Sequence, residues 1–316
     1  MFQIFKIRDF GDFISDTFQF LKIYGKNYFK NYLKHAFVAL LLLMVSMALI
    51  STFYYRVIVT SIGYNGSETY DNSFVTDNAV FLIIGIVVCF LVSLYLGLLN
   101  YTYPVYYLRL VGENPNKMPE LKSIRTLVKN DLGRLLAFGF LSFIIFGLTA
   151  VITFSIAIVL SFVIIGFFIL ILLIPTFITW YSLTLYFYLN KNQSFFTAYK
   201  NALNTIFNNF WTIIGASFCM LIIVYVLSTA VTIIPYIITM VTMVMGTQGI
   251  DGGDIDSSNI SILMIVIIII YCISILVSML LNHLLLIQSG LIYYSEREKI
   301  EQNTIRQSID EIGKYE

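Results

Sequence analysis

The chain has 316 residues, of which 59% are hydrophobic and 12% are charged, and its mean hydropathy is +0.85. Soluble domains average about 45–50% apolar and about 25% charged residues, so this chain has too little polar surface to cover a water-soluble particle. The composition excludes a soluble enzyme, a nucleic-acid-binding protein and a disordered protein. It predicts an integral membrane protein.

Long stretches without Asp, Glu, Lys or Arg locate the membrane-spanning segments. Three of them lie at 135–190, 201–250 and 257–295. Because a spanning helix needs about 20 apolar residues, the first stretch holds two spans and each of the others holds one. Two apolar runs upstream complete an all-α, polytopic membrane protein. The predicted transmembrane helices are 35–57, 79–107, 135–159, 163–189, 211–245 and 260–294.

The basic residues predict the orientation of these spans. Every lysine and arginine except Arg56 lies before the first span, in the second or fourth connection, or after the last span. Loops rich in Lys and Arg face the cytoplasm, so both termini are expected there. A segment with both signs of charge precedes the first span and no small-residue cleavage site follows it, so we do not expect a cleavable signal peptide.

An amphipathic helix is predicted before spans 1, 3 and 5. In the first, Asp12, Asp16, Gln19 and Lys22 occupy the polar face. Each helix is too polar to span but carries an apolar stripe, which favours a position in the headgroup plane. The stripes are Phe10, Phe13, Ile14, Thr17, Phe18, Leu21 and Tyr24; Leu121, Ile124, Val128 and Leu132; and Phe195, Tyr199, Ala202, Ile206 and Phe210.

These features suggest a threefold repeat within one membrane domain. Polar residues precede each entry into the membrane, at 26–29, 129–132 and 208–211, where we expect the chain to turn. The even-numbered spans end in aromatic residues, which are typical of an interfacial belt. The predicted units are 8–110, 117–190 and 194–297, followed by a charged cytoplasmic tail at 298–316. The alternative is that amphipathic linkers and aromatic belts occur in any multispan protein.

Two segments carry a resemblance to known families. They are the aromatic and amide-rich entry 195–211 and the start Arg8-Asp9-Phe10-Gly11-Asp12. The layout resembles the membrane domain associated with glycerophosphodiester phosphodiesterases and the related YciC-like and DUF975-like groups, and the start is similar to that of uncharacterised membrane proteins of the Bacteroidota. The resemblance is architectural and implies a bacterial inner-membrane protein without a catalytic domain.

A few polar residues fall inside the predicted spans. His283, with Asn282 beside it and Asn100 in another span, forms a candidate intramembrane polar site. Polar residues at such depth often mark function, but an interhelical hydrogen bond is their commoner use. Pro104, Pro175 and Pro235 either break helices along a transport pathway or form kinks satisfied by neighbouring helices; kinks are the commoner outcome.

No motif indicates an enzyme, a cofactor or a metal. The chain lacks a Walker loop, GxSxG, HExxH and a dinucleotide fingerprint. The segment 251–256 offers three carboxylates but not the register of an EF-hand, so we interpret it as a solvated acidic turn. Cys89, Cys219 and Cys272 lie far apart inside spans and are interpreted as small apolar residues.

Two functional hypotheses remain. The first is a non-enzymatic scaffold or accessory subunit whose basic cytoplasmic face binds anionic membrane lipid, a protein partner, or both, but no nucleic acid. The second is a transporter or channel for a lipid-like or neutral solute; a lipid-modifying enzyme is a distant third. The predicted headgroup contacts of the first hypothesis are Lys26, Lys30, Lys34, Lys122, Arg125 and Lys129.

Overall fold

A computed structural model of the chain describes residues 2–63, 73–162, 165–190, 193–248 and 257–301. These residues form eight α-helices, and no strand occurs among them. Six of the helices are long and apolar enough to cross a membrane. This confirms the prediction of an all-α protein with six candidate spans, as expected of a multi-pass membrane protein. The acidic turn at 251–256 and most of the tail lie outside the described residues.

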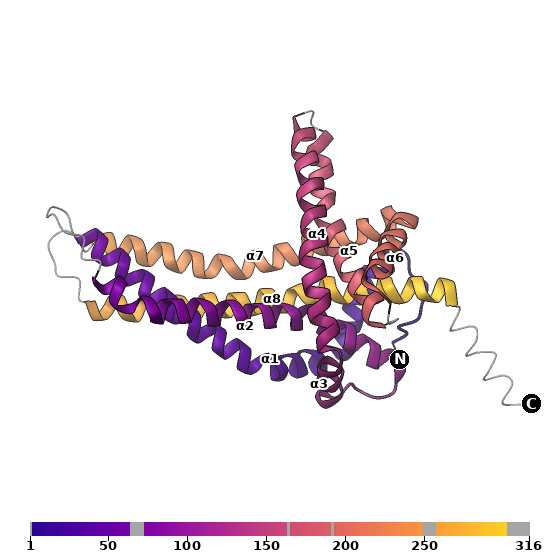
Figure 1. Cartoon of the computed structure of the whole chain (residues 1–316), viewed down its shortest axis with the longest axis horizontal. Coiled ribbons are helices and arrows are strands. Elements are labelled where there is room, and N and C mark those ends of the chain that lie inside the picture. Colours follow the sequence, from indigo (N-terminus) through magenta and orange to yellow (C-terminus); the bar gives the residue numbers. More distant parts are fainter. Residues whose placement is uncertain (1, 64–72, 163–164, 191–192, 249–256, 302–316) are drawn as a thin grey trace, which may run out of the picture. The chain divides into compact units, whose positions relative to one another are not determined.

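The helices follow the predicted order, with two short ones between longer ones (Figure 1). The candidate spans are α1 (Phe10–Gly63), α2 (Ser73–Glu113), α4 (Leu132–Ser161), α5 (Ile165–Asn190), α7 (Phe210–Gln248) and α8 (Ser257–Glu301), and the short helices are α3 (Leu121–Asn130) and α6 (Phe195–Asn208). Pro104, Pro175 and Pro235 lie inside α2, α5 and α7, which continue through them.

Two of the three predicted turns before a span are confirmed. The chain breaks at Asp131 between α3 and α4, and at Asn209 between α6 and α7. The expected turn at 26–29 is wrong, because α1 runs uninterrupted for 54 residues. Its buried face continues across that junction at helical spacing, through Tyr24, Tyr28 and Tyr32, so packing favours a continuous helix there. The first amphipathic segment is therefore the beginning of α1.

The apolar stripes are buried mainly against the protein itself. Ala202 and Ile206 on α6 are fully buried, and α6 packs on α5 with the Trp180 and Tyr199 rings 4.4 Å apart. In the first segment Phe13 and Thr17 are buried, whereas the stripe residues Phe10 and Phe18 are exposed. Whether any of these helices also lies in the headgroup plane remains a prediction.

The chain divides into two compact units. Unit 1 contains residues 2–35, 100–226 and 280–301 among those described, and unit 2 contains 36–99 and 227–279. Unit 1 thus includes the whole of α3 to α6, where α4 and α5 form a hairpin (Figure 1). It also includes the N-terminal parts of α1 and α7 and the C-terminal parts of α2 and α8. The threefold repeat stays a prediction.

The aromatic residues at the ends of the even-numbered spans are buried, so their interpretation as an interfacial belt is wrong. Tyr106, Tyr107 and Tyr293 have no exposed surface, and Tyr186 is 1% exposed. Tyr186 donates a hydrogen bond to the carbonyl of Leu286 on α8 at 3.1 Å. A buried tyrosine hydroxyl usually finds a hydrogen-bond partner, so these side chains are suited to hydrogen bonds between helices.

Candidate functional site

Two rows of basic side chains form an exposed surface in unit 1. Lys26, Lys30 and Lys34 follow one another at four-residue spacing on α1, and all three are exposed. Residues at this spacing share one face of a helix, while Tyr24, Tyr28 and Tyr32 are buried on another. The α1 row of the predicted headgroup contacts is therefore accessible.

The second row lies on α3. Lys122, Arg125 and Lys129 are exposed, whereas Ile124 and Val128 on the opposite face are buried. α3 is amphipathic, and its apolar side faces the protein and its basic side faces outward. We call the six side chains Lys26, Lys30, Lys34, Lys122, Arg125 and Lys129 the basic surface.

Two hydrogen bonds tie the rows together. Arg125 donates from Nη2 to the backbone carbonyl of Lys34 at 3.2 Å. Asn31 donates from Nδ2 to the carbonyl of Pro119, just before α3, at 3.0 Å. Segments almost one hundred residues apart in sequence therefore meet at the basic surface, and a ligand that touches Arg125 also lies near Lys34.

The buried polar residues form a second site, built around His283. Its ring is fully buried, and Nδ1 shares a hydrogen bond of 2.5 Å with the Tyr28 hydroxyl. The rings of Tyr32 and Tyr103 have centroids 4.4 Å and 6.2 Å from that of His283. This aromatic enclosure, drawn from α1, α2 and α8, leaves Nε2 buried without a hydrogen-bond partner among the described residues.

Only part of the predicted intramembrane site is assembled. Tyr32 donates to Asn100 Oδ1 at 3.3 Å, so Asn100 and His283 are linked through the Tyr32 side chain. Asn282 is exposed and does not join them. The sequence did not indicate the tyrosines that connect these groups, because at a helix end a tyrosine is equally typical of the lipid interface.

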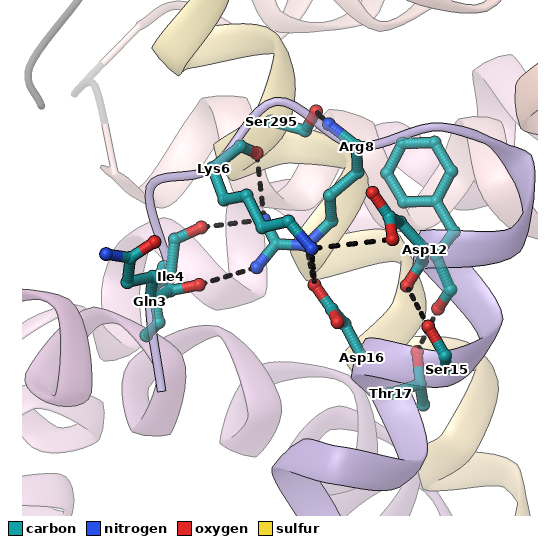
Figure 2. A network of polar contacts seen from close by, with 10 residues as sticks. Gln3, Ile4, Lys6, Arg8, Asp12, Ser15, Asp16, Thr17 and Ser295 are labelled. Atoms are coloured by element: carbon teal, nitrogen blue, oxygen red, sulfur yellow. Dashed lines mark hydrogen bonds and ion pairs between the residues drawn. The ribbon is translucent and has the colours of Figure 1, made fainter. Parts of the chain in front are cut away.

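A third polar cluster, at the N-terminus, was not predicted (Figure 2). Arg8 is 1% exposed, and its Nε donates to Asp16 Oδ2 at 2.9 Å. Its remaining nitrogens donate to the carbonyls of Gln3, Ile4 and Lys6 at 2.6, 2.8 and 3.1 Å. Asp16 is predicted on the polar face of the first amphipathic segment, but it is buried and paired with the Arg8 cation.

Further contacts fix the N-terminal segment in place. The Arg8 backbone N–H donates to Ser295 Oγ on α8 at 3.0 Å, and Lys6 Nζ lies 3.2 Å from Asp16 Oδ2. Burial lowers the pKa of the Arg8 guanidinium from its ordinary value, and the neighbouring Asp16 carboxylate opposes that shift. Arg8 remains charged near neutral pH, so the cluster holds residues 2–9 by charge-assisted bonds.

Metal-ligating side chains do not gather among the described residues. Within these ranges, no group of three or more His, Cys, Asp or Glu side chains is placed to hold a metal ion. Cys272 is buried, and Cys89 and Cys219 are partly buried. The arrangement can bind anions at exposed basic groups and can hold helices together through buried hydroxyls.

Comparisons of the chain with protein-family models, with curated proteins and with solved structures find no match.

Proposed function

We propose that this protein is a non-enzymatic membrane scaffold or accessory subunit, which binds anionic lipid, a protein partner, or both through the basic surface. We further propose a bacterial inner membrane with this surface in the cytoplasm. The resemblance to the membrane domain of glycerophosphodiester phosphodiesterases stays a prediction of the same kind. The observation that carries the proposal is the exposure of all six basic side chains on two helices whose other faces are buried.

The energetics favour an anionic membrane surface. A lysine or arginine near anionic headgroups contributes about 1 kcal/mol, and the contribution falls off within a Debye length of about 8 Å at physiological salt. Six such groups on one surface therefore supply several kcal/mol, all of it sensitive to salt. A partner with an acidic surface would use the same groups, and its binding would weaken with salt in the same way.

The test compares two variants that lose the same charge. Lys122→Gln/Lys129→Gln removes two groups of the basic surface, whereas Lys117→Gln/Lys200→Gln removes two exposed lysines elsewhere. Each full-length protein is purified in mild detergent, and its retained phosphatidylglycerol is titrated by native mass spectrometry. We expect about 30-fold weaker binding for the first variant, from about 1 kcal/mol per residue, and little change for the second.

Equal losses in the two variants would show that only net charge matters, and the basic surface would then not be a binding site. Purification without retained lipid and without a co-purifying protein would refute the scaffold proposal as a whole.

One observation supports a transporter or channel as a second candidate: the buried Nε2 of His283 has no hydrogen-bond partner among the described residues. Unsatisfied polar atoms are costly inside a membrane and often mark function. The protein reconstituted in vesicles should then give solute flux or lipid scrambling that decreases in His283→Ala. Flux equal to that of protein-free vesicles would refute this function.

A further inference from the structure

A separate polar pocket lies in unit 1, where the C-terminal parts of α2, α5 and α8 approach the N-terminal segment. Its volume is about 280 Å³, enough for a small head group. The side chains that line it and matter here are Phe5, Arg109, Glu113, Asn190, Tyr294 and Arg297. None of them belongs to the basic surface or to the His283 cluster.

Two guanidinium groups give this pocket its chemistry. Arg297 donates from Nε and Nη2 to Glu301 Oε2 at 3.1 and 2.7 Å, and its Cζ lies 5.5 Å from the centre of the Phe5 ring. The ion pair and the stacking fix the orientation of the Arg297 fork. Arg109 donates from Nε to Glu113 Oε1 at 2.9 Å, and its two terminal nitrogens remain as donors.

The charges in the pocket restrict what it can bind. Arg109 pairs with Glu113 and Arg297 pairs with Glu301, so these four groups together carry no net formal charge at neutral pH. Charge alone therefore does not attract an anion here, and the C-terminal ends of α2 and α5 at the pocket oppose one. An anion is held well only if it accepts hydrogen bonds from both arginine forks, and tetrahedral phosphate oxygens match that geometry.

We infer that this pocket binds a phosphate group bridged between Arg109 and Arg297. The phosphodiester of a phospholipid head group and a soluble phosphate present the same oxygens to the two guanidinium groups. The inference does not depend on the scaffold proposal, because the pocket and the basic surface share no residue.

The experiment uses the full-length protein in detergent with three probes: dioctanoylphosphatidylcholine, inorganic phosphate and dioctanoylglycerol. Phosphatidylcholine carries a phosphate but no net charge, so the basic surface attracts it little. Binding is measured by calorimetric titration and by the shift of the unfolding midpoint. We expect the two phosphate-bearing probes to bind, and we expect no binding of dioctanoylglycerol, which lacks phosphate. If only inorganic phosphate binds, the ligand is a soluble phosphate. If only the phospholipid binds, the ligand is a lipid.

Two variants with opposite expected effects on affinity distinguish loss of binding from loss of folding. Arg109→Lys preserves the charge but removes the fork and should weaken binding about tenfold, since a hydrogen bond to a charged group is worth about 1.5–3 kcal/mol. Glu113→Gln removes the competing carboxylate and should strengthen binding. Lys122→Gln/Lys129→Gln should bind as the unchanged protein does.

The inference is overturned if neither phosphate-bearing probe binds more tightly than dioctanoylglycerol. It is also overturned if Arg109→Lys and Glu113→Gln both bind with unchanged affinity. A loss of binding in Lys122→Gln/Lys129→Gln with no change in Arg109→Lys would place the phosphate on the basic surface instead.

Discussion

Replacing Arg8 by alanine should destabilise the protein and release its N-terminal segment (Figure 2). The substitution removes the 2.9 Å ion pair with Asp16 and three bonds to backbone carbonyls. Breaking a buried ion pair by removing one partner costs about 3–5 kcal/mol. Because Lys6 stays 3.2 Å from Asp16 and the freed carbonyls can reach water, we expect the lower end, about 3 kcal/mol.

The assay is unfolding in mixed detergent micelles, followed by circular dichroism, together with limited proteolysis of residues 2–9. The control is Lys117→Ala, which breaks an exposed ion pair with Glu120 of 3.0 Å. Exposed pairs contribute about 0.2–1 kcal/mol, so the control should unfold almost as the unchanged protein does.

A double-mutant cycle isolates the ion pair from the packing of the side chains. If Arg8 and Asp16 interact as the distance indicates, Arg8→Ala/Asp16→Ala should be less destabilised than the sum of the single variants by about 1–3 kcal/mol. Additive effects, or an Arg8→Ala variant no less stable than Lys117→Ala, would refute the assignment of a buried pair.

Further substitutions test the packing of α8 in unit 1, each measured by the same unfolding assay. His283→Ala removes a fully buried ring and the partner of the Tyr28 hydroxyl, so the free energy of unfolding should fall by about 3 kcal/mol. Asn282 is the exposed neighbour, and Asn282→Ala should change the free energy of unfolding by less than about 0.5 kcal/mol. Gly290→Ala places a Cβ atom 2.7 Å from Tyr186 Cζ and should cost about 1–3 kcal/mol. Equal effects at positions 282 and 283, or a neutral Gly290→Ala, would contradict the packing described.

The spans were predictable because a membrane imposes a severe cost on buried charge. The charge-free stretch 135–190 predicted helices at 135–159 and 163–189, and the structure has α4 at Leu132–Ser161 and α5 at Ile165–Asn190. Hydropathy predicts the end of a helix less accurately where the helix continues through charged residues. α8 therefore extends to Glu301 rather than to 294.

The exposure of the basic surface was predictable for a similar reason. Lys122, Arg125 and Lys129 lie opposite an apolar stripe, and an unpaired lysine or arginine is rarely buried. The contact between Arg125 and the Lys34 carbonyl was not predictable, because nothing in local spacing relates residues so far apart in sequence.

The tyrosines and Arg8 show that hydrophobic periodicity does not identify the partner of a side chain. An apolar stripe indicates which face of a helix avoids water, but it does not show whether that face contacts lipid or protein. Tyr106 and Tyr186 are therefore predicted as belt residues although they are buried in the protein. The sequence predicts that Asp16 faces solvent, because its partner Arg8 lies outside the helix that contains Asp16 and helical spacing does not relate the two.

Within unit 1, hydrogen bonds connect different helices. Tyr28, Tyr103 and Gln288 bond to groups on other helices. Lipid is as apolar as leucine, so apolar contacts alone give spanning helices little preference for one another over lipid. Cross-helix hydrogen bonds supply such a preference, and they are found in unit 1, which also contains the basic surface and the arginine pocket. These bonds therefore favour a fixed geometry within unit 1, which a ligand at either site would require.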